Sequence, residues 1–125
     1  MYKMNTNISN HFRNNAIGYK RSLCNTLLEK NVGKIPVIVS FRYDDKIKYN
    51  LSSMEMKILV DAEYSVTQML FFLRKKIKLN NCDSCYIFVD RILVPQVMTI
   101  RDLYAKYKDK DGFLYIDLRF METFG

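Results

Sequence analysis

The sequence predicts an α+β fold, with helices at the start of the chain and a mixed β-sheet after them. Three segments carry this prediction. Residues 34–41 are almost continuously apolar or β-branched, which is typical of a buried strand. Ser65 and Gln68 have the spacing of a capping box, and the apolar helical pattern behind them runs to about Ile77. Residues 113–120 form a hydrophobic alternating run, which predicts a last strand close to the end of the chain.

The N-terminal region carries an apolar stripe at helical spacing. Gly18 falls inside this stripe, so we expect two short helices and not one long helix. The stripe consists of Phe12, Ala16, Tyr19, Leu23 and Leu27, with Ile17, Cys24 and Leu28 beside it.

The remaining elements complete an order of strands and helices that is known from one fold. They are strands at 34–41 and 56–60, a helix at 66–77, strands at 86–89 and 92–94, a helix at 100–107 capped by Thr99, and a strand at 113–120. After the N-terminal helices this is the β-grasp order of ubiquitin-like proteins, with the first and last strands as parallel neighbours at the sheet centre. Apolar residues suit that buried place at Ile35, Val37, Val39, Leu114, Ile116 and Leu118. We expect one domain, with a helical extension over 1–31, a β-grasp core over 34–120 and a flexible tail over 121–125.

Composition limits the functional classes. The 125 residues carry a formal charge of +7, which favours acidic partners such as nucleic acid, an anionic membrane surface or acidic peptides. No signature of a nucleic-acid-binding fold accompanies this charge, so we expect no nucleic-acid partner. The sequence has neither an apolar stretch long enough to span a membrane nor a secretory signal, which indicates the cytosol or nucleus.

The residues that most often carry catalysis or metals give no coherent site. Cys82 and Cys85 form a C-x-x-C between a helix end and a strand, whereas a redox motif of the thioredoxin type needs a helix N-terminus. A zinc site needs four ligands, and only Cys24 and His11 remain, both far away in sequence. We therefore expect no catalytic residue, no metal and no cofactor, and we interpret the cysteines as free thiols.

The chain ends at Gly125, five residues beyond the predicted last strand. A terminal glycine carboxylate can be activated as an adenylate or a thioester, and glycine has no side chain to obstruct the attacking amine. Ubiquitin-like modifiers use that arrangement.

Several segments together resemble one family. They are Lys34-Ile35-Pro36-Val37-Ile38-Val39, residues 65–79, Ile87-Phe88-Val89, Leu103-Tyr104, residues 108–116 and the terminal Phe124-Gly125. This combination resembles the autophagy-related protein eight family, whose members are ubiquitin-like proteins conjugated to phosphatidylethanolamine on the autophagosome. The resemblance covers residues 34–125, and the N-terminal helices are similar in pattern more than in letters.

The resemblance implies a monomeric protein that is a substrate and not an enzyme. Activating and conjugating enzymes would pass the Gly125 carboxylate to the lipid amine, and a cysteine protease would process or release it. Phe124 would be gripped by those enzymes. The protein would be cytoplasmic, and bound to the autophagosome or another organelle membrane once lipidated.

The resemblance also implies docking of cargo receptors through aromatic-x-x-aliphatic motifs, by strand addition to the edge strand at 57–60. The aromatic pocket would comprise Leu27, Pro36, Ile38, Lys57, Leu59 and Phe113. The aliphatic pocket would comprise Ile58, Val60, Tyr64, Met69, Phe72 and Leu73. Lys34, Arg74 and Lys76 would form a charged rim that meets acidic residues beside the motif.

Some alternatives stay open. Phe113, out of phase with the core residues of its strand, either lines the pocket or packs under the N-terminal helices. The first helix either contacts a membrane or a partner, or it packs on the β-grasp domain through Leu23, Leu27 and Leu28. The family usually has basic residues before the edge strand and proline after it, whereas this chain has Glu55 and Asp61. The rival functions are a protein-conjugated modifier similar to autophagy-related protein twelve, and a ubiquitin-like module that is never conjugated.

Overall fold

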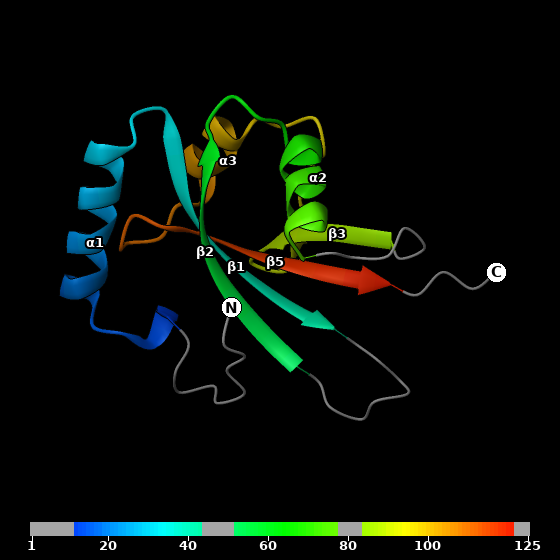
Figure 1. Ribbon diagram of the computed structural model, residues 1–125, viewed down its shortest axis with the longest axis horizontal. Coiled ribbons are helices and arrows are strands. Elements are labelled where there is room, and N and C mark those ends of the chain that lie inside the picture. Colours follow the sequence, from blue (N-terminus) through cyan, green and yellow to red (C-terminus); the bar gives the residue numbers. More distant parts are fainter. Residues whose placement is uncertain (1–11, 44–51, 78–83, 122–125) are drawn as a thin grey trace.

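The computed structural model describes residues 12–43, 52–77 and 84–121. Their elements follow the predicted order (Figure 1). They are a 3-10 turn η2 (Phe12–Asn14), α1 (Ile17–Lys30), β1 (Lys34–Tyr43), β2 (Ser52–Asp61), α2 (Val66–Ile77), β3 (Ser84–Val89), β4 (Ile92–Leu93), α3 (Ile100–Tyr107) and β5 (Leu114–Met121). None of the helices within these described ranges is long and apolar enough to cross a membrane.

The strands form one mixed sheet in the order β2-β1-β5-β3-β4. β1 and β5 are parallel neighbours near its centre, with Val37 opposite Leu114, which confirms the β-grasp prediction. β1 and β2 form an antiparallel pair that continues from Lys34↔Asp61 to Tyr43↔Ser52. Both strands are longer than predicted, because pairing with a neighbour keeps residues of weaker strand propensity extended.

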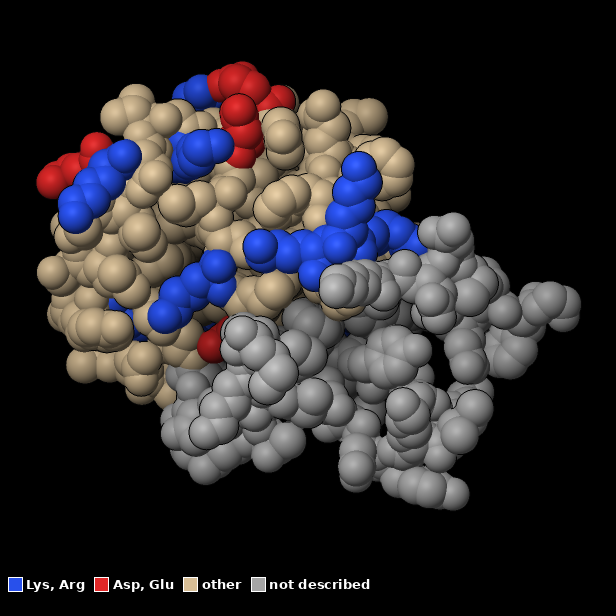
Figure 2. Space-filling view, viewed as in Figure 1, with Lys and Arg blue, Asp and Glu red and all other residues tan. Residues whose placement is uncertain are grey.

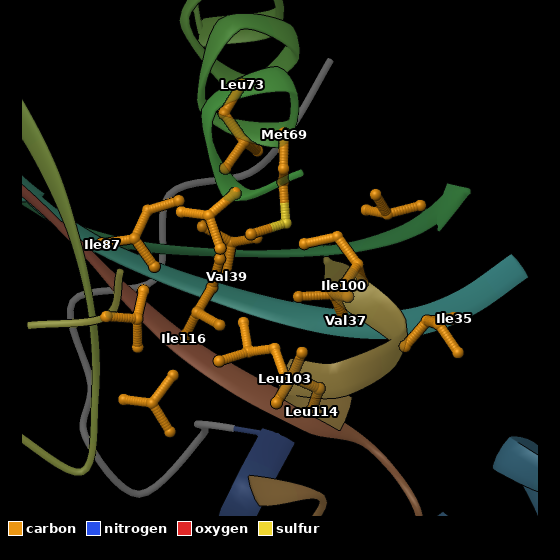
Figure 3. Packing of buried hydrophobic residues seen from close by; sticks show 14 of the residues in the cluster. Ile35, Val37, Val39, Met69, Leu73, Ile87, Ile100, Leu103, Leu114 and Ile116 are labelled. Carbon is orange, nitrogen blue, oxygen red and sulfur yellow. The ribbon is translucent and has the colours of Figure 1, made fainter. Parts of the chain in front are cut away.

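Helices cover both faces of the sheet (Figure 1). α2 and α3 pack on one face, where the main hydrophobic core lies between them and the inward side chains of the strands. Met69 and Leu73 of α2 point toward Val39 of β1 in this core (Figure 3). Of the α3 residues, Ile100 lies beside Val37 and Leu103 lies beside Leu114 of β5. The residues predicted for the sheet centre are all buried: Ile35, Val37, Val39, Leu114, Ile116 and Leu118. α1 packs on the opposite face.

The N-terminal region corrects one prediction. The helical segments separate at Asn15 and Ala16, not at Gly18, which lies in the first turn of α1. A glycine costs little there, because the first amides of a helix have no intrahelical acceptor. The break takes Phe12 off the helix, and it leaves Tyr19, a member of the predicted stripe, 56% exposed.

α1 packs on the sheet through the side of the helix that carries Cys24, and not through Tyr19. Cys24 is buried, and Leu23, Leu27 and Leu28 pack around it, which confirms the packing interpretation of this helix.

Both predicted N-caps are present. The amide of Gln68 donates to Ser65 Oγ at 3.1 Å, and the amide of Ser65 donates to Gln68 Oε1 at 2.8 Å, which completes the capping box. The amide of Asp102 donates to Thr99 Oγ1 at 3.2 Å at the start of α3.

Candidate functional site

The edge of the sheet at β2 is the centre of the candidate site. β1 pairs with one side of β2, and within the described ranges no strand pairs with the other side. Successive side chains of a strand point to opposite faces. Ile58 and Val60 therefore point into the main core, while Lys57 and Leu59 point to the face covered by α1. This edge borders two different surfaces.

An aromatic cluster lies on the α1 face of the sheet. Its buried members are Phe12, Cys24, Ile38 and Phe113, and Leu23, Leu27, Leu28 and Tyr115 pack around them. The rings of Phe12 and Phe113 meet edge to face, with centroids 5.0 Å apart and planes at 79°. The structure thus brings Leu27, Ile38 and Phe113 of the predicted aromatic pocket into one cluster. Phe113 has no exposed surface and packs under the N-terminal segment, the second of the two alternatives for this residue.

The other three residues of that predicted pocket, Pro36, Lys57 and Leu59, lie on β1 and β2 beside the cluster. Pro36, which is buried, stands opposite Leu59 in the β1–β2 register, and Ile38 stands opposite Lys57. The ammonium of Lys57 lies 4.6 Å from the centroid of the Phe12 ring. A cation at this distance from a ring is held by the electrostatic field of the π system.

The predicted aliphatic pocket is mostly part of the core. Ile58, Val60, Met69 and Leu73 are buried in the main cluster. Only Tyr64 and Phe72 offer surface, each 38% exposed. A ligand side chain on this face would therefore first meet Tyr64 and Phe72.

Basic side chains surround this edge. Lys34, Lys57 and Lys76 are exposed, and Arg74 is half-buried. Figure 2 shows Lys and Arg side chains gathered across the face that β2 and α2 present. The charge suits an acidic partner. Asp61, the acid at the end of β2, accepts the amide hydrogen of Glu63 at 2.9 Å and so stabilises the turn after the strand.

Phe12 and Glu55 form a contact at this site that the sequence does not predict. The backbone amide of Phe12 donates to Glu55 Oε1 at 2.7 Å, although the residues are 43 positions apart. The local signal is Asn15, a residue of low helix propensity at the break between η2 and α1. Nothing in the sequence pairs Phe12 with Glu55.

A buried carboxylate fixes the entry of β5 beneath the aromatic cluster. Asp111 accepts the amide of Phe113 at 2.8 Å and the hydroxyl of Tyr115 at 2.5 Å. Burial raises the pKa of Tyr115 above its usual value, and the hydrogen bond to Asp111 raises it further. The phenol therefore stays a donor.

Several predicted residues lie outside the described ranges. Gly125 and Phe124 follow Met121, the last described residue, and Cys82 and His11 also fall outside. Cys85 and Cys24 are buried, and neither of them forms a disulfide. Within the described ranges, no three His, Cys, Asp or Glu residues are grouped so that they could hold a metal.

Comparison with known proteins decides the family. Residues 20–125 match the family described as "Autophagy protein Atg8 ubiquitin like". The chain belongs to the Atg8 family. Autophagy-related protein 8 of Neosartorya fischeri and that of Aspergillus niger are each 36% identical over 99 residues, which are 78% of this chain and 80% of the relative. A crystal structure of Trypanosoma brucei ATG8 has a TM-score of 0.77 at 26% identity and covers 95% of this chain and 100% of its own.

These comparisons confirm the predicted family and the predicted ubiquitin-like α+β fold. Members of this family are modifiers and not enzymes, as predicted for this chain. Atg8 family proteins are ubiquitin-like modifiers that function in autophagy. Their role implies contacts with conjugation enzymes and with cargo receptors.

Proposed function

We propose that this protein is conjugated through the carboxylate of Gly125 to phosphatidylethanolamine during autophagosome formation. The family match extends through Gly125, which supports this assignment. The carboxylate would first attack ATP to give an adenylate and release pyrophosphate. A thiol of the activating enzyme would displace AMP, and the thioester would pass to the conjugating enzyme. The lipid amine would then form an amide and release that thiol.

A reconstituted reaction tests the conjugation. It combines the protein, its activating and conjugating enzymes, ATP, and vesicles with or without phosphatidylethanolamine. We expect a thioester that becomes a vesicle-bound product only with that lipid and is lost in Gly125→Ala. Transfer to a protein lysine would instead favour a modifier of the autophagy-related protein twelve type. No thioester, with enzymes active on a control modifier, would leave an unconjugated binding module.

We also propose that β2 binds aromatic-x-x-aliphatic peptides by strand addition, and the unpaired edge of β2 is the observation that carries this. Side chains three positions apart in a strand point to opposite faces. An added peptide strand would thus place its aromatic residue on the α1 face, near Lys57 and Phe113, and its aliphatic residue over Tyr64 and Phe72. The motif spacing fits an edge that borders one hydrophobic surface on each face.

Peptide binding is tested by fluorescence anisotropy with a short labelled peptide that has acidic residues before Phe-x-x-Leu. We expect Lys57→Ala to weaken binding, because this residue lies on the edge strand beside the aromatic cluster. The control is Lys106→Ala, an exposed lysine of α3. Equal binding by wild type and Lys57→Ala would place the peptide elsewhere.

A further inference from the structure

The ring of Phe12 lies where a ligand's aromatic side chain would go. It contacts Phe113 and Ile38, which belong to the proposed aromatic pocket, and it is 4% exposed. Lys57, also of that pocket, lies over the same ring. We propose that Phe12 is an intramolecular occupant of the aromatic pocket, and that a peptide binds only after η2 has moved away. This inference rests on the proposed peptide docking.

Phe12 is arranged as an occupant and not as a wall of the pocket. It belongs to η2, a single turn that Asn15 and Ala16 separate from α1. The other members of the cluster come from the sheet, from α1 and from the turn before β5. The ring makes two contacts that any aromatic ligand would seek: an edge-to-face contact with Phe113 and a cation–π contact with Lys57.

Polar contacts hold the turn in this position. The hydrogen bond from the Phe12 amide to Glu55 attaches the turn to the edge strand itself. Lys20 Nζ donates to the carbonyl oxygen of Arg13 at 2.7 Å. The Arg13 guanidinium pairs with Asp109 at 3.2 Å and lies 4.4 Å from the centroid of the Tyr115 ring. The turn is thus attached to β2, to α1 and to the loop before β5.

The hydrogen bond to Glu55 attaches η2 to the strand that is proposed to bind the peptide. Glu55 lies two residues before Lys57 and therefore on the same face of β2. When Phe12 leaves, the Glu55 carboxylate loses its amide partner, and this loss adds to the cost of opening. The apparent affinity for a peptide is the intrinsic affinity reduced by the fraction of molecules in which the turn is displaced.

Two variants test the competition in the full-length protein by anisotropy with the labelled Phe-x-x-Leu peptide. Phe12→Ala removes the occupant, and we expect about tenfold tighter binding. Glu55→Ala keeps the Phe12 side chain but removes the carboxylate that accepts the Phe12 amide hydrogen. We expect about threefold tighter binding, because the turn is then displaced more often. The control is Phe71→Ala, which truncates a phenylalanine that is 68% exposed on α2. We expect no change in its affinity.

A fluorescent reporter follows the displacement directly. The chain contains no tryptophan, so Phe12→Trp gives the protein a single indole at this position. We expect a short-wavelength emission maximum for the buried ring and a shift to longer wavelength on addition of the tryptophan-free peptide. This measurement does not depend on whether Phe12→Ala folds.

The outcomes separate the two proposals. Tighter binding by both variants, with an emission shift, would support the occupant. Unchanged or weaker binding by Phe12→Ala and Glu55→Ala, while the wild type still binds the peptide, would contradict the proposal that Phe12 occupies the pocket. The proposal that the peptide binds along β2 would stand. An emission maximum that does not move at saturating peptide would contradict the proposal about Phe12 as well. If no form of the protein binds the peptide, the result contradicts peptide binding along β2, and the proposal about Phe12, which rests on it, is contradicted too.

Discussion

The ammonium of Lys20 on α1 lies 3.4 Å from the carboxylate of Asp111 in the loop before β5, and both side chains are almost fully buried. Asp111 also accepts hydrogen bonds from Phe113 and Tyr115. One buried ion pair therefore joins the N-terminal helix to the central strand, beneath the aromatic cluster. Its partners satisfy both charges.

Removing one partner of this pair should destabilise the protein strongly. Lys20→Met leaves a buried carboxylate without its counter-charge, and we expect a loss of about 3–5 kcal/mol in the free energy of unfolding. Urea denaturation measures it. The control Lys106→Met changes an exposed lysine of α3 and should stay within about 0.5 kcal/mol of wild type. A loss from Lys20→Met as small as that of the control would show that the pair contributes little.

Gly112 permits the close approach of α1 to the turn before β5. Its φ is +93°, and a Cβ there would lie 2.6 Å from Cys24 Sγ. We expect Gly112→Ala to cost about 2–4 kcal/mol, partly from the backbone conformation and partly from the contact. Thermal unfolding of a double-mutant cycle with Cys24→Ala separates the two causes, because that variant makes room but leaves φ unchanged. Additive losses would mean that the contact with Cys24 is relieved in some other way.

The capping box at the start of α2 should have a small, defined effect. Ser65→Ala removes the acceptor of the Gln68 amide, and we expect a loss of about 1 kcal/mol, measured by urea denaturation. Ser22→Ala, on the exposed side of α1, is the matched control and should have almost no effect. Equal losses in the two variants would contradict a capping role.

The local patterns in the sequence predict most of this fold, but they do not predict the long-range contacts of the candidate site. The capping box of Ser65 and Gln68 is formed by residues three positions apart, and the buried strand at 34–41 follows from its own composition. The place of Phe12 depends on Glu55, 43 residues away, and no local pattern encodes that contact. The resemblance predicts that Ile58 and Val60 line a pocket, whereas the structure buries them in the main core with Met69 and Leu73 of α2.

Stability at high pH should depend on Tyr104. Burial, followed by the influence of the neighbouring Cys24 thiol and the Asp111 carboxylate, raises the pKa of Tyr104 from 10.0 to about 12. The hydroxyl donates to the carbonyl oxygen of Gly112 at 2.6 Å, which only the protonated phenol can do. Between these two pKa values the folded protein holds a proton that the unfolded chain releases. The stabilisation is therefore complete below pH 10 and falls as the pH rises toward 12.

The measurement compares urea denaturation of wild type and Tyr104→Phe at pH values from about 9 to about 11.5. We expect wild type to lose stability more steeply than the variant, which lacks the ionisable hydroxyl. The difference in slope should be less than about 1.4 kcal/mol per pH unit, because Tyr104 is only half-buried and solvent screens part of the effect. Lysine ionisation affects both proteins alike and cancels in the comparison. Parallel curves would mean that the phenol ionises equally in the folded and unfolded states, and that the hydrogen bond to Gly112 does not hold its proton.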